Sequence, residues 1–258
     1  MANIHAFLQK SFSSLLSSII LPLPLVNYQL VKVAKANSYV ETLGSCADTL
    51  HGWIKKSYEE DFRAAFEKQV RKALKHLSVR YAKLAFDITT EPFYGKARTL
   101  HIIETKGESY GAEFKFITVC LITRNKQISL MALPVRLGNQ TKLAIDLLEY
   151  CETLFAGIRL ALFDRGFYIA ELIDYLEAKR IRYIILVPEK KGKLQEYVRQ
   201  TQELGKFIHP MKYAKEKSTW KPKTMIVVYK GIGEYDWIFA TNINFRTRVE
   251  YIWHYKRR

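Results

Sequence analysis

The sequence predicts an α/β fold in which a mixed β-sheet is covered by helices. Two observations support this. From Tyr81 onward, short β-rich runs replace the helical periodicity of the preceding residues, and the later runs alternate with amphipathic helical segments. The composition is globular, because 48% of the residues are hydrophobic and 26% are charged. We therefore expect one domain with a sizeable buried core and a smaller accessory region.

The accessory region is residues 1–78, which we expect to be helical. Its clearest segment runs from Tyr58 to Leu77, where apolar residues recur at spacings of three and four. Acidic residues fill the first turn of this segment and basic residues the last, as the helix dipole favours. The sequence therefore predicts a helix here.

The main domain, residues 79–258, begins with seven elements in the order βββαβαβ. The predicted strands cover residues 81–88, 114–122, 127–135, 159–163 and 182–188, and the predicted helices cover residues 141–155 and 169–179. Three antiparallel strands followed by two right-handed β-α-β steps form a mixed sheet with helices on its faces. This is the element order of a ribonuclease-H-like core.

An insertion is expected at about residues 190–242, before a last helix. Residues 189–207 are rich in Lys, Gln and Glu, which favours a helix or a loop. Residues 224–229 and 236–241 are predicted to form a hairpin around Gly231 and Gly233. Residues 247–258 have helical composition and contain no stop signal.

The charge balance points to a polyanionic partner. Lys and Arg number 41 against 25 Asp and Glu, which gives a net charge of +16, and the basic residues are dispersed over the chain. Nucleic acid is the leading partner, and residues 1–78 are then a natural DNA-binding region. A basic surface of the ribosomal or thermostable type, and a simple packing role for the first helices, stay open as alternatives.

Cysteine usage and hydropathy indicate a cytoplasmic protein without a membrane span. The three cysteines, Cys46, Cys120 and Cys151, are odd in number and form no Cys-x-x-Cys pair, so neither a disulfide framework nor a zinc site is indicated. The apolar stretch at residues 15–26 is too short to span a bilayer and contains Pro22 and Pro24.

Two aspartates stand out. Asp87 interrupts the apolar run Leu84-Ala85-Phe86, where an unpaired charge is costly to bury. Asp164 ends the run at residues 160–163, and the carboxyl ends of strands are where open α/β sheets bind ligands. Each could simply cap a turn. Together they predict a site for Mg²⁺ or Mn²⁺, since hard cations prefer oxygen ligands and two such ions suit phosphoryl transfer.

The run Ala-Leu-Phe-Asp-Arg-Gly-Phe-Tyr at residues 161–168, with the strand that follows it, resembles the second-aspartate region of DDE transposases in the group named for insertion sequence four. The resemblance implies that Asp87 and Asp164 are catalytic and ligate two Mg²⁺ or Mn²⁺ ions. It implies cleavage at the terminal inverted repeats of a transposon and joining of the 3′ hydroxyl to target DNA. It also implies double-stranded DNA partners, a homodimer in a synaptic complex, and a prokaryotic, nucleoid-associated protein.

The family signature Tyr-x-x-Arg-x-x-x-Glu begins at Tyr255 and Arg258. Its glutamate would fall four residues after Arg258, so we expect the third catalytic carboxylate to be missing from these 258 residues and catalysis to be impaired. Glu250 lies twelve residues before that position, roughly 18 Å along a helix, which is too far to replace it. We expect Arg165, Tyr255 and Arg258 to contact DNA.

Two other readings stay open. A noncatalytic DNA-binding remnant of a transposon would be basic and folded but chemically silent. A ribonuclease-H-fold nuclease, such as a junction resolvase, would need a local acid, and Glu91 and Glu104 are poorly placed for this role. Three tryptophans are candidates for stacking on a displaced base, although burial in a core is the commoner fate of this residue: Trp220, Trp237 and Trp253.

Overall fold

The structure, a computed structural model, is described for residues 58–94, 101–105, 111–124, 127–136, 138–188, 193–211, 222–231, 236–245, 249–256 and 258. The chain divides into two compact units, residues 1–78 and 79–258, which are treated separately. The helices expected before residue 58, the apolar stretch at residues 15–26, Cys46, Trp220 and Gly233 lie outside the described residues.

Helix α5 (Glu59–Lys75) is the described element of the first unit. It confirms the helix predicted from Tyr58 to Leu77, with ends that differ by one and two residues. Lys72 and Lys75 lie in its last turn, where the helix dipole favours positive charge.

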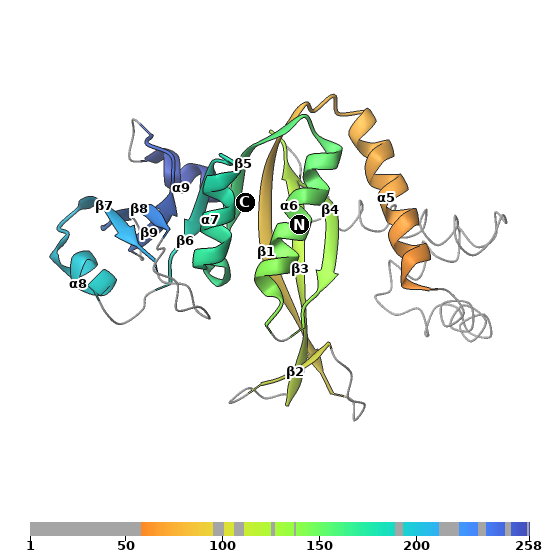
Figure 1. Cartoon of the computed structure of the whole chain (residues 1–258), viewed down its shortest axis with the longest axis horizontal. Coiled ribbons are helices and arrows are strands. Elements are labelled where there is room, and N and C mark those ends of the chain that lie inside the picture. The colour runs from red at the N-terminus through yellow and green to blue at the C-terminus, as the bar shows by residue number, and fades with distance from the viewer. Residues whose placement is uncertain are drawn as a thin grey trace. The chain divides into compact units, whose positions relative to one another are not determined.

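The second unit contains a nine-stranded mixed sheet (Figure 1). Its strands are β1 (Tyr81–Phe93), β2 (Ile102–Glu104), β3 (Ala112–Ile122), β4 (Gln127–Pro134), β5 (Gly157–Phe163), β6 (Tyr183–Leu186), β7 (Leu204–Pro210), β8 (Lys223–Tyr229) and β9 (Trp237–Thr241). The helical segments of this unit are α6 (Gln140–Leu154), the 3-10 turn η1 (Arg165–Phe167), α7 (Ala170–Ala178), α8 (Lys193–Gln200) and α9 (Val249–Lys256).

The predicted βββαβαβ order is confirmed and is the ribonuclease-H-like order. It is formed by β1, β3, β4, α6, β5, α7 and β6, and the short strand β2 is an addition to it. Strand β3 lies antiparallel between β4 and β1, while β1 is parallel to β5 and β5 to β6. The carboxyl ends of β1, β5 and β6 therefore point in one direction.

Alternation along β1 gives the sheet two different faces. Phe86 points to one face, where its ring stacks on Phe163 at 4.5 Å and meets the edge of Phe167 at 6.4 Å. Helices α6 and α7 lie side by side in front of the sheet in Figure 1. Ala85 belongs to a different cluster, which includes Leu162 and Tyr251 of α9. Residues of β1 that share the face of Ala85 therefore lie on the α9 side of the sheet.

The insertion extends the same sheet. Strand β9 pairs antiparallel with β6, β8 with β9 and β7 with β8, so the hairpin predicted from the segments at 224–229 and 236–241 is confirmed. The expectation of only helix or loop at residues 189–207 was wrong in its last part, where α8 is followed by β7. The positions of β7 are only half-buried or exposed, so its sequence lacks the apolar run of an inner strand. Strand β2 was also missed, because three residues carry no periodic signal.

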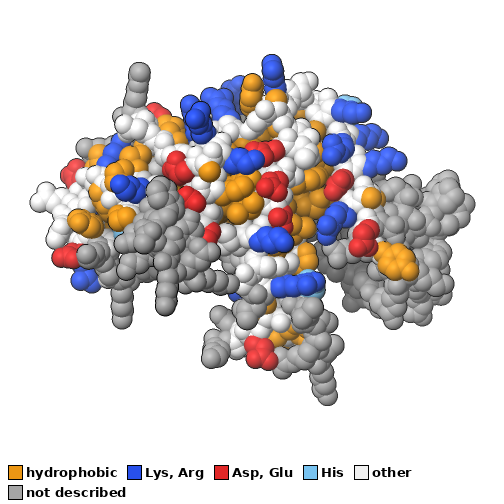
Figure 2. All heavy atoms as spheres, viewed as in Figure 1, with side chains coloured by type: hydrophobic (Ala, Val, Ile, Leu, Met, Phe, Trp, Pro, Cys, Tyr) orange, Lys and Arg blue, Asp and Glu red, His pale blue; other side chains and the backbone are white. Residues whose placement is uncertain are grey.

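Charge is spread over the surface without one dominant patch on the face seen in Figure 2. Lys and Arg side chains recur there between fewer acidic ones, with apolar areas among them. Among the described helices, none combines the length and the apolar character needed to cross a bilayer.

Candidate active site

Asp87 lies on β1 at the point where the strand passes from buried to mostly exposed residues. Leu84 and Phe86 just before it are fully buried, whereas the Asp87 side chain is 53% exposed. Its Oδ1 accepts a hydrogen bond of 3.0 Å from the backbone N–H of Ile88. Thr118 faces it on β3, and the Thr118 hydroxyl donates to the Asp87 carbonyl at 3.5 Å. The backbone around the carboxylate is thus fixed by strand pairing.

Asp164 is the first residue after β5 and precedes the 3-10 turn η1. The Phe167 N–H donates to the Asp164 carbonyl at 3.0 Å, which closes this turn. Gly166 lies so close to β1 that a Cβ at its position would be 2.8 Å from the Ile88 Cδ1. Gln140 of α6 donates to the Gly166 carbonyl at 2.7 Å. The Asp-Arg-Gly turn is therefore held against the neighbouring strand and helix.

The two aspartates follow paired residues of neighbouring parallel strands, Asp87 within β1 and Asp164 just after β5. Phe86 and Phe163 are register partners in the β1–β5 pair, and each aspartate is the next residue of its strand or turn. Asp87 is two residues from Ala85, so it shares the α9 side of the sheet. The structure thus brings together the two carboxylates singled out from the sequence.

Tyr255 of α9 and Arg258, two residues after the end of this helix, add a phenol and a guanidinium to the carboxylates. The Tyr255 hydroxyl donates a hydrogen bond of 3.0 Å to Asp164 Oδ1. Arg258 Nη1 lies 3.5 Å from Asp87 Oδ1 and 3.6 Å from Asp164 Oδ1. The Arg258 N–H donates to the Tyr255 carbonyl at 3.0 Å, a bond that spans three residues and ties Arg258 to the end of α9.

An aromatic wall fixes Tyr255. Its side chain is buried, with the Phe239 ring at 5.4 Å and the edge of Trp237 at 6.2 Å. The Arg258 guanidinium lies over the Tyr255 ring itself, 4.9 Å from its centre. Trp237 is thus part of the support of the site, which the sequence alone did not indicate.

The charges of the site are linked. Partial burial raises the pKa of Asp164, but the Arg165 backbone N–H, the Arg258 charge and the Tyr255 hydroxyl outweigh burial, so this pKa lies below its ordinary value. Burial raises the pKa of Tyr255; the Arg258 charge opposes this, while the Asp164 charge adds to it. Asp164 is therefore a carboxylate at neutral pH, and Tyr255 stays protonated and donates to it.

Other candidates lie away from the pair of aspartates. Glu91 is four residues further along β1, about 13 Å at the rise of a strand. Glu250 is in the first turn of α9, eight residues or about 12 Å before Arg258. Arg165 is exposed on η1 immediately after Asp164. Within the described part of the chain, no group of three or more His, Cys, Asp or Glu side chains is placed to hold a metal ion.

The donor set nevertheless fits a hard divalent cation held by two carboxylates. Mg²⁺ is usually bound by one or two carboxylates, with water and substrate phosphate as its other ligands. Asp87 and Asp164 present carboxylates from adjacent strands to one point, where the Arg258 Nη1 lies close to both. The positively charged guanidinium of Arg258 thus lies close to both carboxylates.

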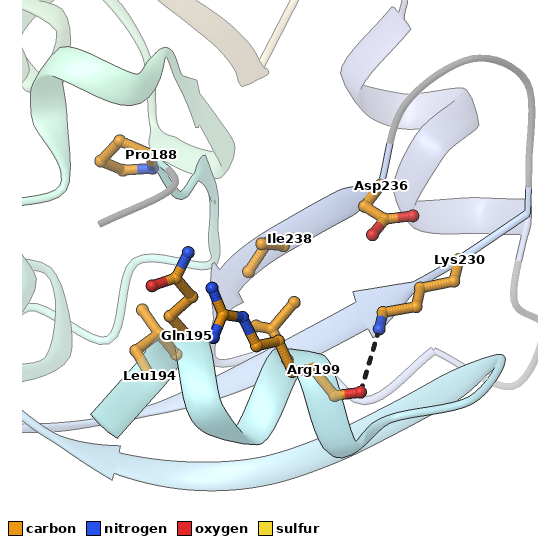
Figure 3. Close-up of a pocket in the computed structure, with 8 residues that line it drawn as sticks. Pro188, Leu194, Gln195, Arg199, Lys230, Asp236 and Ile238 are labelled. Carbon is orange, nitrogen blue, oxygen red and sulfur yellow. Dashed lines mark hydrogen bonds between the residues drawn. The ribbon is translucent and has the colours of Figure 1, made fainter. Parts of the chain in front are cut away.

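A separate small cavity lies in the insertion, between α8 and strands β8 and β9 (Figure 3). It has a volume of about 150 Å³. Its lining residues are Leu194, Gln195, Val198 and Arg199 of α8 together with Pro188, Lys230, Asp236 and Ile238. Lys230 Nζ donates to the Arg199 carbonyl at 3.4 Å across its rim. This volume is smaller than the roughly 300 Å³ at which ligand pockets begin, so we assign no ligand to it.

Comparison with known proteins gives a family. No curated protein matches the chain. Among solved structures, the chain is similar to a piggyBac transposase in a cryo-EM synaptic complex with hairpin DNA, at 12% identity and a TM-score of 0.48, over 98% of this chain and 56% of that chain. The chain thus spans little more than half of that protein.

The model of the transposase DDE domain family matches residues 91–251. This range contains Asp164, begins four residues after Asp87 and ends before Tyr255. It covers more than half of the chain, and the protein therefore belongs to the transposase DDE domain family.

Proposed function

We propose that this chain is the transposase of an insertion sequence, which cuts DNA at transposon ends and joins the freed 3′ hydroxyl to target DNA. DNA phosphoryl transfer is the general activity of its family. The observation that carries the proposal for this chain is that Asp87, within β1, and Asp164, just after β5, follow a register pair of two adjacent parallel strands and share the Arg258 Nη1. Two carboxylates at one point suit a reaction whose transition state carries negative charge on both the attacking and the leaving oxygen.

In this proposal Asp87 and Asp164 hold the divalent cations, Mg²⁺ or Mn²⁺, in a site for two ions. Bound ions of this kind activate the attacking oxygen and stabilise the leaving one. Tyr255 keeps one Asp164 oxygen in a fixed position through its hydrogen bond of 3.0 Å. Arg258 neutralises both carboxylates before DNA arrives and can then turn to a phosphate, because a guanidinium binds phosphate as well as carboxylate.

The DNA partner is double-stranded DNA: the terminal inverted repeats and the target. We propose Arg165 as a phosphate contact, because it is exposed and adjacent to Asp164. A net charge of +16 favours such a partner. We also propose that two copies of the chain act together, since both ends of a transposon are joined in one reaction.

The described residues bring two carboxylates to the site and no third. By the resemblance of Tyr255 and Arg258 to the family signature, a glutamate four residues after Arg258 would project from the same helix face. A continued α9 would therefore bring that acid next to Asp87 and Asp164.

The test uses a duplex carrying the inverted repeats that flank the gene, with Mg²⁺ or Mn²⁺. Residues 1–258 followed by three alanines and a glutamate should cleave more than residues 1–258 alone. A glutamine in place of that glutamate is the control. Equal cleavage with the glutamate and with the glutamine would refute a role for this third carboxylate.

A second candidate function is a noncatalytic DNA-binding protein, which the occupation of the site by Arg258 favours. Metal binding separates the two. If the site is functional, Mn²⁺ should raise the melting temperature, and Asp87→Asn or Asp164→Asn should abolish the rise. Asp146→Asn, the same change on α6, should keep it. Salt-sensitive DNA binding with no Asp164-dependent effect of Mn²⁺ would favour the noncatalytic protein.

A further inference from the structure

A basic cavity opens at the other end of the central strands. It has a volume of about 390 Å³ and is lined by the first residues of β1 and β5, the residue before β6, the end of β3, the segment after β9 and part of α9. Four cationic side chains line it: Lys83, Arg124, Arg159 and Arg182. None of the lining residues is acidic. Positive charge of this density in a concave site attracts an anion.

Aromatic residues stand among these cations. Trp253 and Tyr81 both line the cavity, and they are 49% and 56% exposed. Exposure of this extent means that neither ring is simply part of the core, which is the usual fate of tryptophan. Exposed aromatic rings beside cationic side chains are the combination that binds single-stranded nucleic acid, because the rings stack on bases and the cations contact phosphates.

The cavity is organised by α9. Lys83 Nζ lies 2.9 Å from His254 Nδ1 and 5.6 Å from the centre of the Trp253 ring. An ammonium group has only donors, so in this bond Lys83 is the donor and His254 Nδ1 the acceptor. The Lys83 side chain is thus held at the wall of the cavity by the His254 ring nitrogen and the aromatic face of Trp253.

The cavity and the aspartates lie along the same strand and the same helix. Lys83 and Asp87 are four residues apart on one face of β1, about 13 Å at the rise of a strand. Trp253 and His254 of α9 border the cavity, while Tyr255 and the following Arg258 contact the carboxylates. A strand of nucleic acid bound in the cavity would therefore be a few nucleotides away from the carboxylates.

We propose that this cavity binds an unpaired segment of a DNA strand, with a phosphate between Arg159 and Arg182 and a base stacked on Trp253. The inference rests on the proposed function for its choice of DNA. It assigns a contact for single-stranded DNA that is separate from the two aspartates. It requires no metal ion and no third carboxylate.

The test is the binding of a fluorescent oligothymidine strand in EDTA, followed by anisotropy at several salt concentrations. Arg159→Gln together with Arg182→Gln should weaken binding about tenfold or more and reduce the salt slope by about 0.7 for each lost phosphate contact. Lys142→Gln, a single charge removed from an exposed position of α6, should stay within about twofold of the unchanged protein. The proposal would be overturned if the double variant lost no more binding free energy per removed charge than Lys142→Gln does.

Stacking on Trp253 has its own readout. Trp253→Ala should weaken binding of the thymidine strand about tenfold, and Trp253→Phe less, since a stacked base contributes a factor of this order. On an abasic strand of the same length, Trp253→Ala and the unchanged protein should bind equally. If Trp253→Ala lost as much affinity for the abasic strand as for the thymidine strand, stacking would be refuted. If thymidine monophosphate bound as tightly as the strand, a strand would be refuted as the occupant.

These results are distinguishable from failure of the proposed function. All binding is measured without divalent cations, so absent cleavage does not affect it. Conversely, the substitutions at Arg159, Arg182 and Trp253 could leave strand binding unchanged while cleavage still depends on the two aspartates. That combination of results would overturn the inference about the cavity and leave the proposed function standing.

Discussion

The Tyr255 hydroxyl donates a hydrogen bond of 3.0 Å to Asp164 across 91 positions of the chain. Through this bond the last described helix holds a carboxylate at the end of β5. Tyr255 is itself held by the aromatic rings of β9, Trp237 and Phe239. The strands of the insertion thus support the carboxylates indirectly, because β9 pairs with β6 and carries the wall on which Tyr255 packs.

Removal of that hydroxyl should destabilise the protein modestly. Tyr255→Phe keeps the ring in its aromatic wall and loses one hydrogen bond to a carboxylate, whose side chain is 35% exposed, so water can replace part of the bond. We expect a loss of about 1 kcal/mol in the free energy of unfolding, measured by urea denaturation. Tyr197→Phe, at a half-exposed ring on α8, is the control and should change stability by less than about 0.5 kcal/mol. An unchanged stability of Tyr255→Phe would mean that the bond does not hold the site.

Arg258 should compete with divalent cations for the site. Its Nη1 lies within 3.6 Å of both carboxylates, so a bound ion must share or displace this charge. We expect Arg258→Ala to bind Mn²⁺ several-fold more tightly, as measured by calorimetry or by loss of the free Mn²⁺ electron-resonance signal. Arg258→Lys keeps a charge but loses the planar guanidinium, so its Mn²⁺ affinity should lie between those of Arg258→Ala and the unsubstituted protein. Weaker Mn²⁺ binding by Arg258→Ala would instead indicate that the guanidinium supports the ion.

The sequence was sufficient for the central fold because its strands carry local signals. The run at β6 is apolar at every position and fully buried, and the amphipathic helices around it have the expected period. Asp87 and Asp164 were found for the same reason, since a carboxylate that interrupts or ends an apolar run is conspicuous. Their proximity then followed from the parallel pairing of β1 and β5.

Contacts between distant segments could not be read in this way. Arg258 and Asp87 are 171 positions apart, and nothing local in either segment encodes their meeting. Arg258 was expected only as a DNA contact, by resemblance. The basic cavity was missed for the same reason, because Lys83 of β1, Arg159 of β5 and Arg182 just before β6 are brought together only by folding. Edge strand β7 was missed because its half-exposed positions lack an apolar run.

Cys151 should resist alkylation in the folded protein. It is fully buried on α6, and burial raises the pKa of its thiol to about 12. Iodoacetamide at pH 8 should leave it unmodified, as peptide mass spectrometry can show for each cysteine separately, and should modify it in urea. Above about pH 9 the unfolded chain loses this proton while the folded chain keeps it. Stability should therefore fall as the pH rises from about 9 to about 12. Rapid modification of Cys151 at pH 8 without denaturant would contradict its burial.

Thr241 should be essential for joining the insertion to the central sheet. It is fully buried at the end of β9, where its hydroxyl donates to the Tyr183 carbonyl of β6 at 2.6 Å and accepts from the Ile243 N–H at 3.1 Å. Thr241→Val keeps the shape but leaves both backbone groups without this partner, which we expect to cost roughly 2 to 3 kcal/mol.

The matched variant Thr241→Ser separates the hydroxyl from the methyl group. It keeps both hydrogen bonds and loses one buried methyl, about 0.8 kcal/mol. Thermal unfolding should therefore show a melting temperature roughly 4 to 12 °C lower for Thr241→Val and a clearly smaller decrease for Thr241→Ser. The reverse order would show that packing of the methyl group, and not the hydroxyl, stabilises the junction of β6 and β9.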